Sequence, residues 1–308
     1  MKKPLPLILD TDIGSDIDDT WALAMILRSP ELDLRMVTTT AFDTTYQAKL
    51  AAKMLEVAGR TDVIVGVGVS APKMKNMDGN TNQGQWVEDY DLEAYPNLRK
   101  DGVDAMVEYI MASEERITVL AIGPCNNLAE AIKKEPRITE KSRLVFIGAS
   151  LYNNAFPGWY PPLGRESNIN VDIEAYRIGV EKNDWEVELL PLDVSGNVNL
   201  DKHYFDYIKE KAKTDVLLGA LIENNDIWMD NMNWERGSGR TSPLFDTVGV
   251  YALITRENIV YQDLPVYVSD KGITLIDPTL GKWMDCGIKW IDKEKFYKFL
   301  TARLCGEI

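Results

Sequence analysis

The stretch LILDTDIGSDIDDTWAL, residues 7–23, decides the fold of this chain. It starts inside an apolar run at residues 5–9, which predicts a buried strand, and it ends in an apolar segment from Thr20, which predicts a buried helix. Between the two lie five carboxylates, Asp10, Asp12, Asp16, Asp18 and Asp19. A buried strand that passes directly into a buried helix is typical of α/β folds, and the acidic turn between them marks a candidate ligand site.

Short apolar runs and helical patterns alternate along the chain. The predicted strands are residues 34–41, 63–69, 117–122, 144–148 and 187–192, and the predicted helices are residues 44–58, 103–114, 127–134 and 172–181. Strands that are apolar on both faces and separated by helices indicate a parallel sheet covered on both sides. We therefore expect an α/β fold, one domain over residues 1–308, with a mostly parallel central sheet flanked by helices and a Rossmann-like open core. Such sheets bind ligands beyond the carboxyl ends of their strands.

The later part of the chain has a different pattern. After about Asp201 it is more helical, and we expect a helical layer beside the sheet. The apolar runs 264–268 and 272–276 predict an antiparallel hairpin. Two long polar loops, residues 71–100 and 150–166, have a length that is more often functional than decorative.

Bulk composition limits the function classes. The chain has 308 residues and a formal net charge of −14, which disfavours binding to nucleic acid or to an anionic membrane surface. No apolar stretch reaches the 18 or so residues that cross a bilayer, and the apolar run near the first residues is shorter than we expect for a signal peptide. The three cysteines, Cys125, Cys286 and Cys305, are too widely spaced for a disulfide framework or a zinc site. These features predict a cytoplasmic protein with small-molecule substrates.

The acidic turn predicts a metal site. Capping of the following helix explains one or two of its carboxylates, but five mutually repelling charges need a compensating cation. The turn contains no histidine, and hard oxygen ligands favour Ca²⁺ or Mg²⁺ over Zn²⁺. The number of available carboxylates suits the higher coordination number of Ca²⁺.

Three protein classes carry acidic turns of this kind. An EF-hand loop starting at Asp10 is excluded, because Gly14, Ser15 and Trp21 stand where it needs an acidic or amide residue, Gly and Glu. The segment Asp10-Thr11-Asp12 superficially matches a haloacid-dehalogenase-type phosphatase. The third class is the nucleoside hydrolases, which open with Asp-x-Asp-x-Gly-x-Asp-Asp after a strand.

Over most of its length the chain resembles the nucleoside hydrolase family. Residues 10–19 resemble the opening motif, with a two-residue expansion before Asp18 and Asp19. Further resemblances follow in the family's order at residues 37–39 (VTT), 55–60 (LEVAGR), 122–129 (IGPCNNLA), 166–172 (ESNINVD), 191–195 (PLDVS) and 246–250 (DTVGV). Each match is weak alone, but their common order is specific and does not fit a phosphatase.

The resemblance implies Ca²⁺-dependent hydrolysis of the N-glycosidic bond of ribonucleosides or a related N-ribosyl compound. A metal-bound water would attack, with Asp12 as general base and inversion at the anomeric carbon. The metal ligands implied are Asp12, Asp19, Asp246 and the backbone carbonyl of Asn126. The implied ribose-binding residues are Asp18, Glu166 and Asn168. The carboxylates would stabilise the oxocarbenium-like transition state, and chelated ribose hydroxyls would orient the sugar.

Several positions depart from the family pattern. The expansion leaves open whether Asp16 or Asp18 completes the site. Asp43 stands where the family has Asn, and it either reaches the metal shell or ribose or caps the helix from Thr44. The chain has Phe245 where pyrimidine-tolerant members place a histidine, and its one histidine, His203, is predicted to lie on the surface.

Purine-preferring members of the family instead stack the base between aromatic rings, so the resemblance implies a slight preference for purine ribosides. Trp228 is the expected stacking residue; the other aromatic residues in the regions that would surround the base are Trp86, Trp159, Tyr160 and Trp234. Core packing is the competing interpretation for each tryptophan. The alternative functions are a Mg²⁺-dependent phosphohydrolase and a catalytically silent ribosyl-binding protein. The family resemblance also implies a homo-oligomer, either a dimer or a tetramer.

Overall fold

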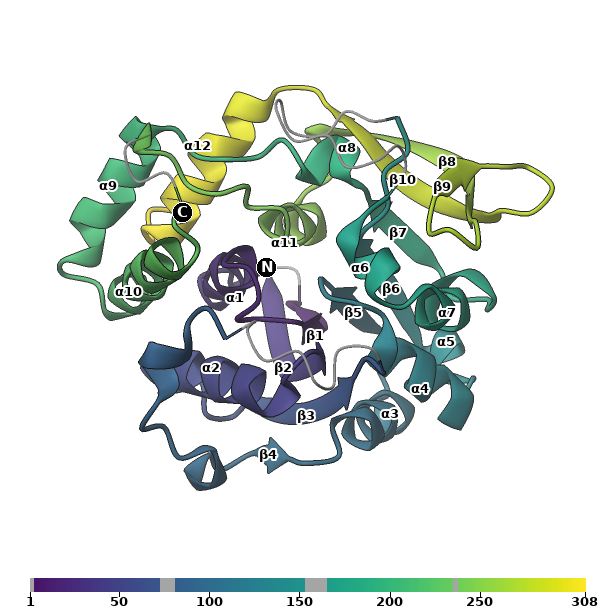
Figure 1. Ribbon diagram of the computed structural model, residues 1–308, viewed down its shortest axis with the longest axis horizontal. Helices are drawn as coiled ribbons and strands as arrows, with labels where there is room; N and C mark the ends of the chain where they lie inside the picture. The colour runs from purple at the N-terminus through teal and green to yellow at the C-terminus, as the bar shows by residue number, and fades with distance from the viewer. Residues whose placement is uncertain (1–2, 73–80, 153–164, 235–237) are drawn as a thin grey trace.

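The computed structural model describes residues 3–72, 81–152, 165–234 and 238–308. Its strands are β1 (Leu5–Thr11), β2 (Leu32–Ala41), β3 (Ile64–Ser70), β4 (Leu98–Arg99), β5 (Ile117–Ala121), β6 (Ser142–Ile147), β7 (Val187–Leu190), β8 (Ile259–Val268), β9 (Thr274–Ile276) and β10 (Lys282–Trp290). In the described part of the chain these form one ten-stranded sheet in the order β4-β3-β2-β1-β5-β6-β7-β10-β8-β9. The sheet runs through the centre of the molecule between layers of helices (Figure 1).

Most neighbouring strands are parallel. All pairs from β4 to β7, and the pair β7–β10, run parallel, whereas β10–β8 and β8–β9 run antiparallel. The predicted α/β class with a mostly parallel sheet is therefore confirmed. The predicted hairpin is also present, as β8 and β9.

Strand β10 is absent from the sequence prediction. It lies between β7 and β8, so the hairpin joins the parallel part of the sheet through β10 rather than directly. Its buried residues Met284 and Cys286 are flanked by the exposed Trp283 and the half-buried Asp285. Such a half-buried strand has no continuous apolar run, which is why the sequence pattern missed it.

The helices lie in two layers that cover opposite faces of the sheet. The main ones are α1 (Asp18–Leu27), α2 (Thr44–Val57), α3 (Gly102–Ala112), α4 (Asn126–Lys134), α5 (Ile138–Lys141), α6 (Ser167–Val171), α7 (Ile173–Tyr176), α8 (Leu192–Ser195), α9 (Lys202–Ala212), α10 (Val216–Asn231), α11 (Thr247–Ile254) and α12 (Lys293–Leu304). One core lies under α1, α2 and α8 to α12, and a second lies under α3 to α7. In the described part of the chain, no helix is long and apolar enough to cross a membrane.

The alternation of side chains along the strands explains the two cores. In β1, Leu7 and Leu9 belong to the first core and Ile8 to the second. In β6, Val145 and Ile147 face the first core, whereas Leu144 and Phe146 face the second. Because successive residues of a strand point to opposite faces, both faces of a central strand must be apolar. The predicted helical layer after Asp201 is confirmed as α9 to α12.

Three predicted segments differ in detail. Residues 172–181 form α7 followed by a π-helix, η3 (Arg177–Glu181), rather than one α-helix. The predicted loop 71–100 contains two 3₁₀ turns, η1 (Gly84–Val87) and η2 (Leu92–Ala94), and the short strand β4. Of the second predicted loop, residues 153–164 lie outside the described residues.

Candidate functional site

A pocket of about 240 Å³ opens at the carboxyl ends of β1, β5 and β6, as expected for a parallel sheet. Side chains from the β1–α1 turn, from α6 and from the start of α11 meet in this pocket. The lining residues are Asp12, Ser15, Asp16, Asp18, Asp19, Ile122, Ile147, Glu166, Ser167, Asn168, Leu192, Phe245 and Asp246. Six of the predicted site residues are among them: Asp12, Asp18, Asp19, Glu166, Asn168 and Asp246.

The β1–α1 turn is held in shape by local contacts. Gly14 has φ +99°, and a Cβ there would lie 2.5 Å from Leu50 and 2.7 Å from the Tyr46 ring, so only glycine fits. The Tyr46 hydroxyl donates a hydrogen bond of 3.3 Å to the carbonyl of Gly14. This closed turn directs Asp18 and Asp19 from the first turn of α1 into the pocket.

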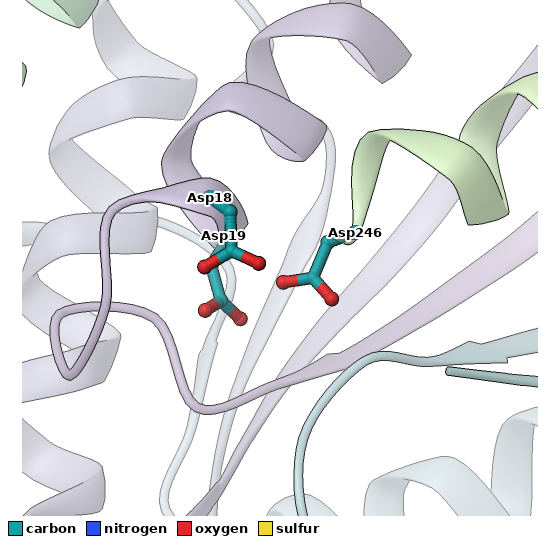
Figure 2. Close-up of side chains that lie close together, drawn as sticks. All are labelled: Asp18, Asp19 and Asp246. Carbon is teal, nitrogen blue, oxygen red and sulfur yellow. The ribbon is translucent and has the colours of Figure 1, made fainter. Parts of the chain in front are cut away.

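Three carboxylates converge at the centre of the site. Oxygen atoms of Asp18, Asp19 and Asp246 lie within 4.8 Å of one another, and each of these residues is buried. Asp18 and Asp19 come from the start of α1 and Asp246 from the start of α11, and their side chains point toward one another (Figure 2). Buried hard oxygen donors at this spacing fit a divalent cation such as Ca²⁺.

The electrostatics of this three-carboxylate cluster also favour a bound cation. Burial, followed by the charges of neighbouring aspartates, raises the pKa values of Asp19 and Asp246 well above 3.8. Burial and the Asp16 charge do the same for the pKa of Asp18. Like charges that cannot reach water must take up protons or share a cation. The donor set therefore fits a resident metal ion.

Asp12 lies in the pocket beside this cluster and is not one of the three mutually close carboxylates. Its Oδ2 accepts a hydrogen bond of 3.0 Å from the Ser15 hydroxyl. Burial raises the pKa of Asp12 to about 7, against the hydrogen bond from Ser15. A Cβ on Gly123 would lie 2.8 Å from both the amide nitrogen and Oδ1 of Asp12, so the close approach of the β5 end to Asp12 requires glycine.

Glu166 and Asn168 form the opposite wall. The Glu166 carboxylate accepts hydrogen bonds from the backbone N–H groups of Asn168 (2.8 Å), Ile169 (3.1 Å) and Ala149 (3.3 Å). The Asn168 amide donates to the carbonyls of Ile122 (2.9 Å) and Ile147 (3.1 Å), at the ends of β5 and β6. Both side chains are thereby held rigidly at the pocket.

Three other predicted site residues are not among the described residues that line the pocket. Asp43 caps α2, because its Oδ1 accepts a hydrogen bond of 3.0 Å from the backbone of Tyr46, so the alternative interpretation as a cap is observed. Asn126 begins α4, and its side chain donates to Asp172 at 3.0 Å. Trp228 is buried in α10 with its ring centroid 5.6 Å from that of Trp234. Their roles toward metal or substrate stay predictions.

Phe245, the one histidine and the other aromatic residues named in the prediction lie in different parts of the structure. Phe245 lines the pocket, directly before Asp246. His203 is exposed on α9, as predicted. Trp86 is buried beside α10, where its indole donates to Glu223 at 3.1 Å. The predicted residues Trp159 and Tyr160 lie outside the described residues.

The sequence prediction missed part of the wall. Ser15, Ser167, Ile122, Ile147 and Leu192 line the pocket without having been assigned a role. Ile122 and Ile147 follow or end parallel strands, which is a signal that could have placed them at the ligand edge. The two serines stand next to motif residues and carry no signal of their own.

The fold agrees with comparisons to known proteins. A family model described as inosine-uridine preferring nucleoside hydrolase matches residues 7–298. A pyrimidine-specific ribonucleoside hydrolase, RihA of Enterobacter sp. (strain 638), is 29% identical, with 97% of each chain covered. A non-specific ribonucleoside hydrolase, RihC of Klebsiella pneumoniae, is 32% identical over 71% of this chain and 72% of its own.

Similarity to solved structures extends over the whole fold. The inosine-uridine preferring nucleoside hydrolase of Bacillus anthracis superposes with a TM-score of 0.79 at 18% identity, covering 99% of this chain and 100% of that one. At that identity the likeness shows the common fold, while the family model covers nearly the whole sequence. Taken with the convergent carboxylates, these matches show that the chain belongs to the inosine-uridine preferring nucleoside hydrolase family.

Proposed function

We propose that this protein hydrolyses the N-glycosidic bond of ribonucleosides, or of a related N-ribosyl compound, with Ca²⁺ as its cofactor and Asp12 as general base. Membership of the family makes the chain a hydrolase that acts on N-glycosyl bonds. The observation that carries the finer proposal is the convergence of Asp18, Asp19 and Asp246 beside Asp12 in one pocket. A pocket with buried carboxylates on one side and Glu166 and Asn168 on the other can hold a cation and a sugar together.

Asp19 and Asp246 would hold the cation, with Asp12 and the carbonyl of Asn126 as the further predicted ligands. Asp18 lies close enough to be a ligand as well, or to bind a ribose hydroxyl as the sequence predicts. When bound, the cation would lower the pKa of a coordinated water and neutralise part of the carboxylate charge. The large number of hard oxygen donors favours Ca²⁺ over Mg²⁺.

The side chains of the pocket then have distinct tasks. Asp12 accepts the proton of the attacking water, and the hydroxyl of Ser15 orients its carboxylate. The surrounding carboxylates stabilise the positive charge that develops on the sugar. Glu166 and Asn168 hold the outer hydroxyls of the ribose, which positions its anomeric carbon. Direct attack by water inverts the configuration at that carbon.

The proposed base preference depends on the residue that precedes Asp246. Phe245 stands where an imidazole could protonate the departing base, and this supports the slight preference for purine ribosides. The two relatives named above are described as pyrimidine-specific and non-specific, so a purine preference would distinguish this chain from them. We also propose a cytoplasmic homo-oligomer, either a dimer or a tetramer, that acts on small molecules rather than on nucleic acid or membranes.

The test is release of reducing sugar from a panel of purine and pyrimidine ribosides, with Ca²⁺, with Mg²⁺ and with a chelator. We expect release that needs Ca²⁺ and that falls at least a thousandfold in Asp12→Asn, a substitution of nearly the same shape. Asp12→Asn with wild-type activity would remove the general base. Phosphate release from phosphate monoesters without sugar release would instead identify the Mg²⁺ phosphohydrolase. Ribose binding without any turnover would identify the silent homologue.

A further inference from the structure

The titratable side chains that line the described pocket are all acidic. Six of the lining residues carry carboxyl groups: Asp12, Asp16, Asp18, Asp19, Glu166 and Asp246. Among the described residues that line the pocket, none is Lys, Arg or His. The one histidine of the sequence, His203, is exposed on α9 beside Asp201 and Lys202 in a separate hollow. The side chains that line the described pocket are therefore able to carry negative charge and none is able to carry positive charge.

The polar groups of the wall are also poorly suited to protonate a departing base. Glu166 accepts three backbone hydrogen bonds, which holds it in the acceptor role. The Ser15 hydroxyl donates to Asp12, and the Asn168 amide donates to two strand-end carbonyls. These donors are therefore already committed within the protein. A neutral base that leaves as an anion needs a proton from an acid, and the described wall offers no imidazole, ammonium or guanidinium group for that role.

Apart from Ser167, the remaining residues that line the pocket are apolar. Phe245, Leu192, Ile122 and Ile147 line the pocket together with the carboxylates. An aromatic ring and aliphatic side chains form a surface for a flat ring, and the face of a phenyl ring attracts a cation. This combination of negative field and aromatic surface favours a flat ring that carries a positive charge.

We propose that the preferred substrates are ribosides whose base is already cationic, with the N-ribosylpyridinium compounds as the chemical class. This inference rests on the proposed function, and it concerns the leaving group of the same reaction. The charged ring would lie against Phe245, and the carboxylate wall would offset its charge. The absence of an imidazole or another cationic acid from the described wall then does not slow the reaction, because a pyridinium base departs as a neutral pyridine.

The reaction balances without any further reactant. The bond between the anomeric carbon and the pyridinium nitrogen breaks, and its electron pair stays on nitrogen, which becomes neutral. The oxygen of water bonds to the anomeric carbon, and Asp12 accepts the released proton. The products are ribose and a neutral pyridine. No proton is delivered to the leaving group at any point.

The first experiment compares the intact Ca²⁺-loaded enzyme on nicotinamide riboside, inosine and uridine. We expect kcat/KM for nicotinamide riboside to exceed that for both neutral nucleosides by at least tenfold. Equal or faster cleavage of inosine or uridine overturns this inference and leaves the proposed function intact. Lack of sugar release from all three overturns both, so the two failures are distinguishable.

A matched ligand tests the role of charge itself. The reduced dihydropyridine form of nicotinamide riboside has the same substituents and a neutral ring. Measured as an inhibitor, it should bind at least tenfold more weakly than the cationic form, and the difference should shrink as salt screens the wall. Equal affinity for the two forms at low salt would contradict the electrostatic part of the argument.

Two variants of one residue test the wall. Phe245→Leu keeps the surface apolar and removes the ring, so KM for nicotinamide riboside should rise several-fold with little change in kcat. Phe245→His introduces an acid, so it should raise kcat for inosine and uridine at least tenfold and leave kcat for nicotinamide riboside unimproved. Circular dichroism spectra that match the wild type exclude a folding defect. If Phe245→His fails to accelerate either neutral nucleoside in a folded protein, the missing-acid argument is wrong.

Discussion

The side-chain amide of Asn127 donates a hydrogen bond of 2.7 Å to Oδ1 of Asp10 and so joins the start of α4 to the strand that leads into the acidic turn. The same amide group donates to the carbonyl of Thr39 at 2.9 Å, and its oxygen accepts from the N–H of Val69 at 2.8 Å. One buried side chain therefore links β1, β2 and β3. It also stands next to Asn126, whose carbonyl is a predicted metal ligand.

This linkage predicts a large effect of Asn127→Ala. Removing two buried hydrogen bonds and a partly buried one, and leaving their partners unsatisfied, should lower the free energy of unfolding by about 3 kcal/mol, measured by urea denaturation. Asn97→Ala serves as the control, because Asn97 is exposed and donates to the carbonyl of Thr61 alone. That variant should lose less than about 1 kcal/mol. Similar losses in both variants would argue against the bridging role.

The carboxylate cluster predicts that Ca²⁺ stabilises the protein. A ligand that binds only the folded state at a hundred times its Kd adds about 2.7 kcal/mol, so Tm should rise on addition of Ca²⁺ and fall again with a chelator. Asp246→Asn removes one charged donor from the cluster, and its Tm should no longer respond to the same Ca²⁺ concentration.

Asp292→Asn is the matched control for this measurement. Asp292 caps α12 by accepting hydrogen bonds from Glu294 and Lys295, and asparagine caps helices equally well. Its Tm response to Ca²⁺ should therefore equal that of the wild type. A wild-type response in Asp246→Asn would show that the ion binds elsewhere.

The close approach of Gly123 to Asp12 predicts a selective loss of catalysis. In Gly123→Ala the new Cβ would lie 2.8 Å from Oδ1 of Asp12, so the general base must shift. We expect kcat to fall at least a hundredfold in steady-state assays, since small displacements of a catalytic group are costly.

Gly219→Ala is the control in which the added methyl group has room. Gly219 lies inside α10, and a Cβ there would come no closer than 3.4 Å to its nearest neighbour, Ala212. This variant should gain roughly 0.5–1 kcal/mol of stability at unchanged activity. An unchanged kcat in Gly123→Ala would show that the pocket accommodates the methyl group without moving Asp12.

Glu166 predicts how stability depends on pH in the metal-free protein. Burial raises the pKa of Glu166 from 4.5 to about 7. The folded state therefore retains a proton that the unfolded state releases, and the associated stability is present below pH 4.5 and is lost as the pH rises to about 7. For a buried group this difference is on the order of 3 kcal/mol.

The comparison with Glu166→Gln isolates this effect, because glutamine does not titrate. Between pH 5 and pH 8 the free energy of unfolding of the wild type should fall relative to that of the variant, both measured with a chelator present. A wild type that becomes relatively more stable toward pH 8 would mean that Glu166 is ionised in the fold with a lowered pKa.

Much of the fold could be predicted from local patterns. The strand and helix on either side of the acidic turn are buried on all sides, so continuous apolar runs revealed them. The half-buried strand β10 has no such run, because Asp285 is half-buried and Trp283 is exposed, and it was missed. The interruption of residues 172–181 by a π-helix also carried no pattern that would separate it from an α-helix.

Some residues of the candidate site could likewise be placed from the sequence, and others only from the structure. Asp18 and Asp19 are neighbours in sequence, and their place at the start of α1 could be derived from the turn alone. The order of motifs pointed to Asp246 and Glu166 through family resemblance rather than through spacing. Phe245 was noted as a departure from the family, but its position in the pocket wall became apparent only from the structure.

The sequence by itself determined the α/β class, the acidic turn and the family, because strand burial, helix starts and motif order are written in short contiguous segments. The tertiary structure decided which carboxylates meet. Strand order and the packing of α11 against α1 bring Asp246 to Asp18 and Asp19, while Asp12 lies beside the group that they form. Distances of a few ångströms between remote segments depend on the packing of the whole core, and no local pattern encodes them.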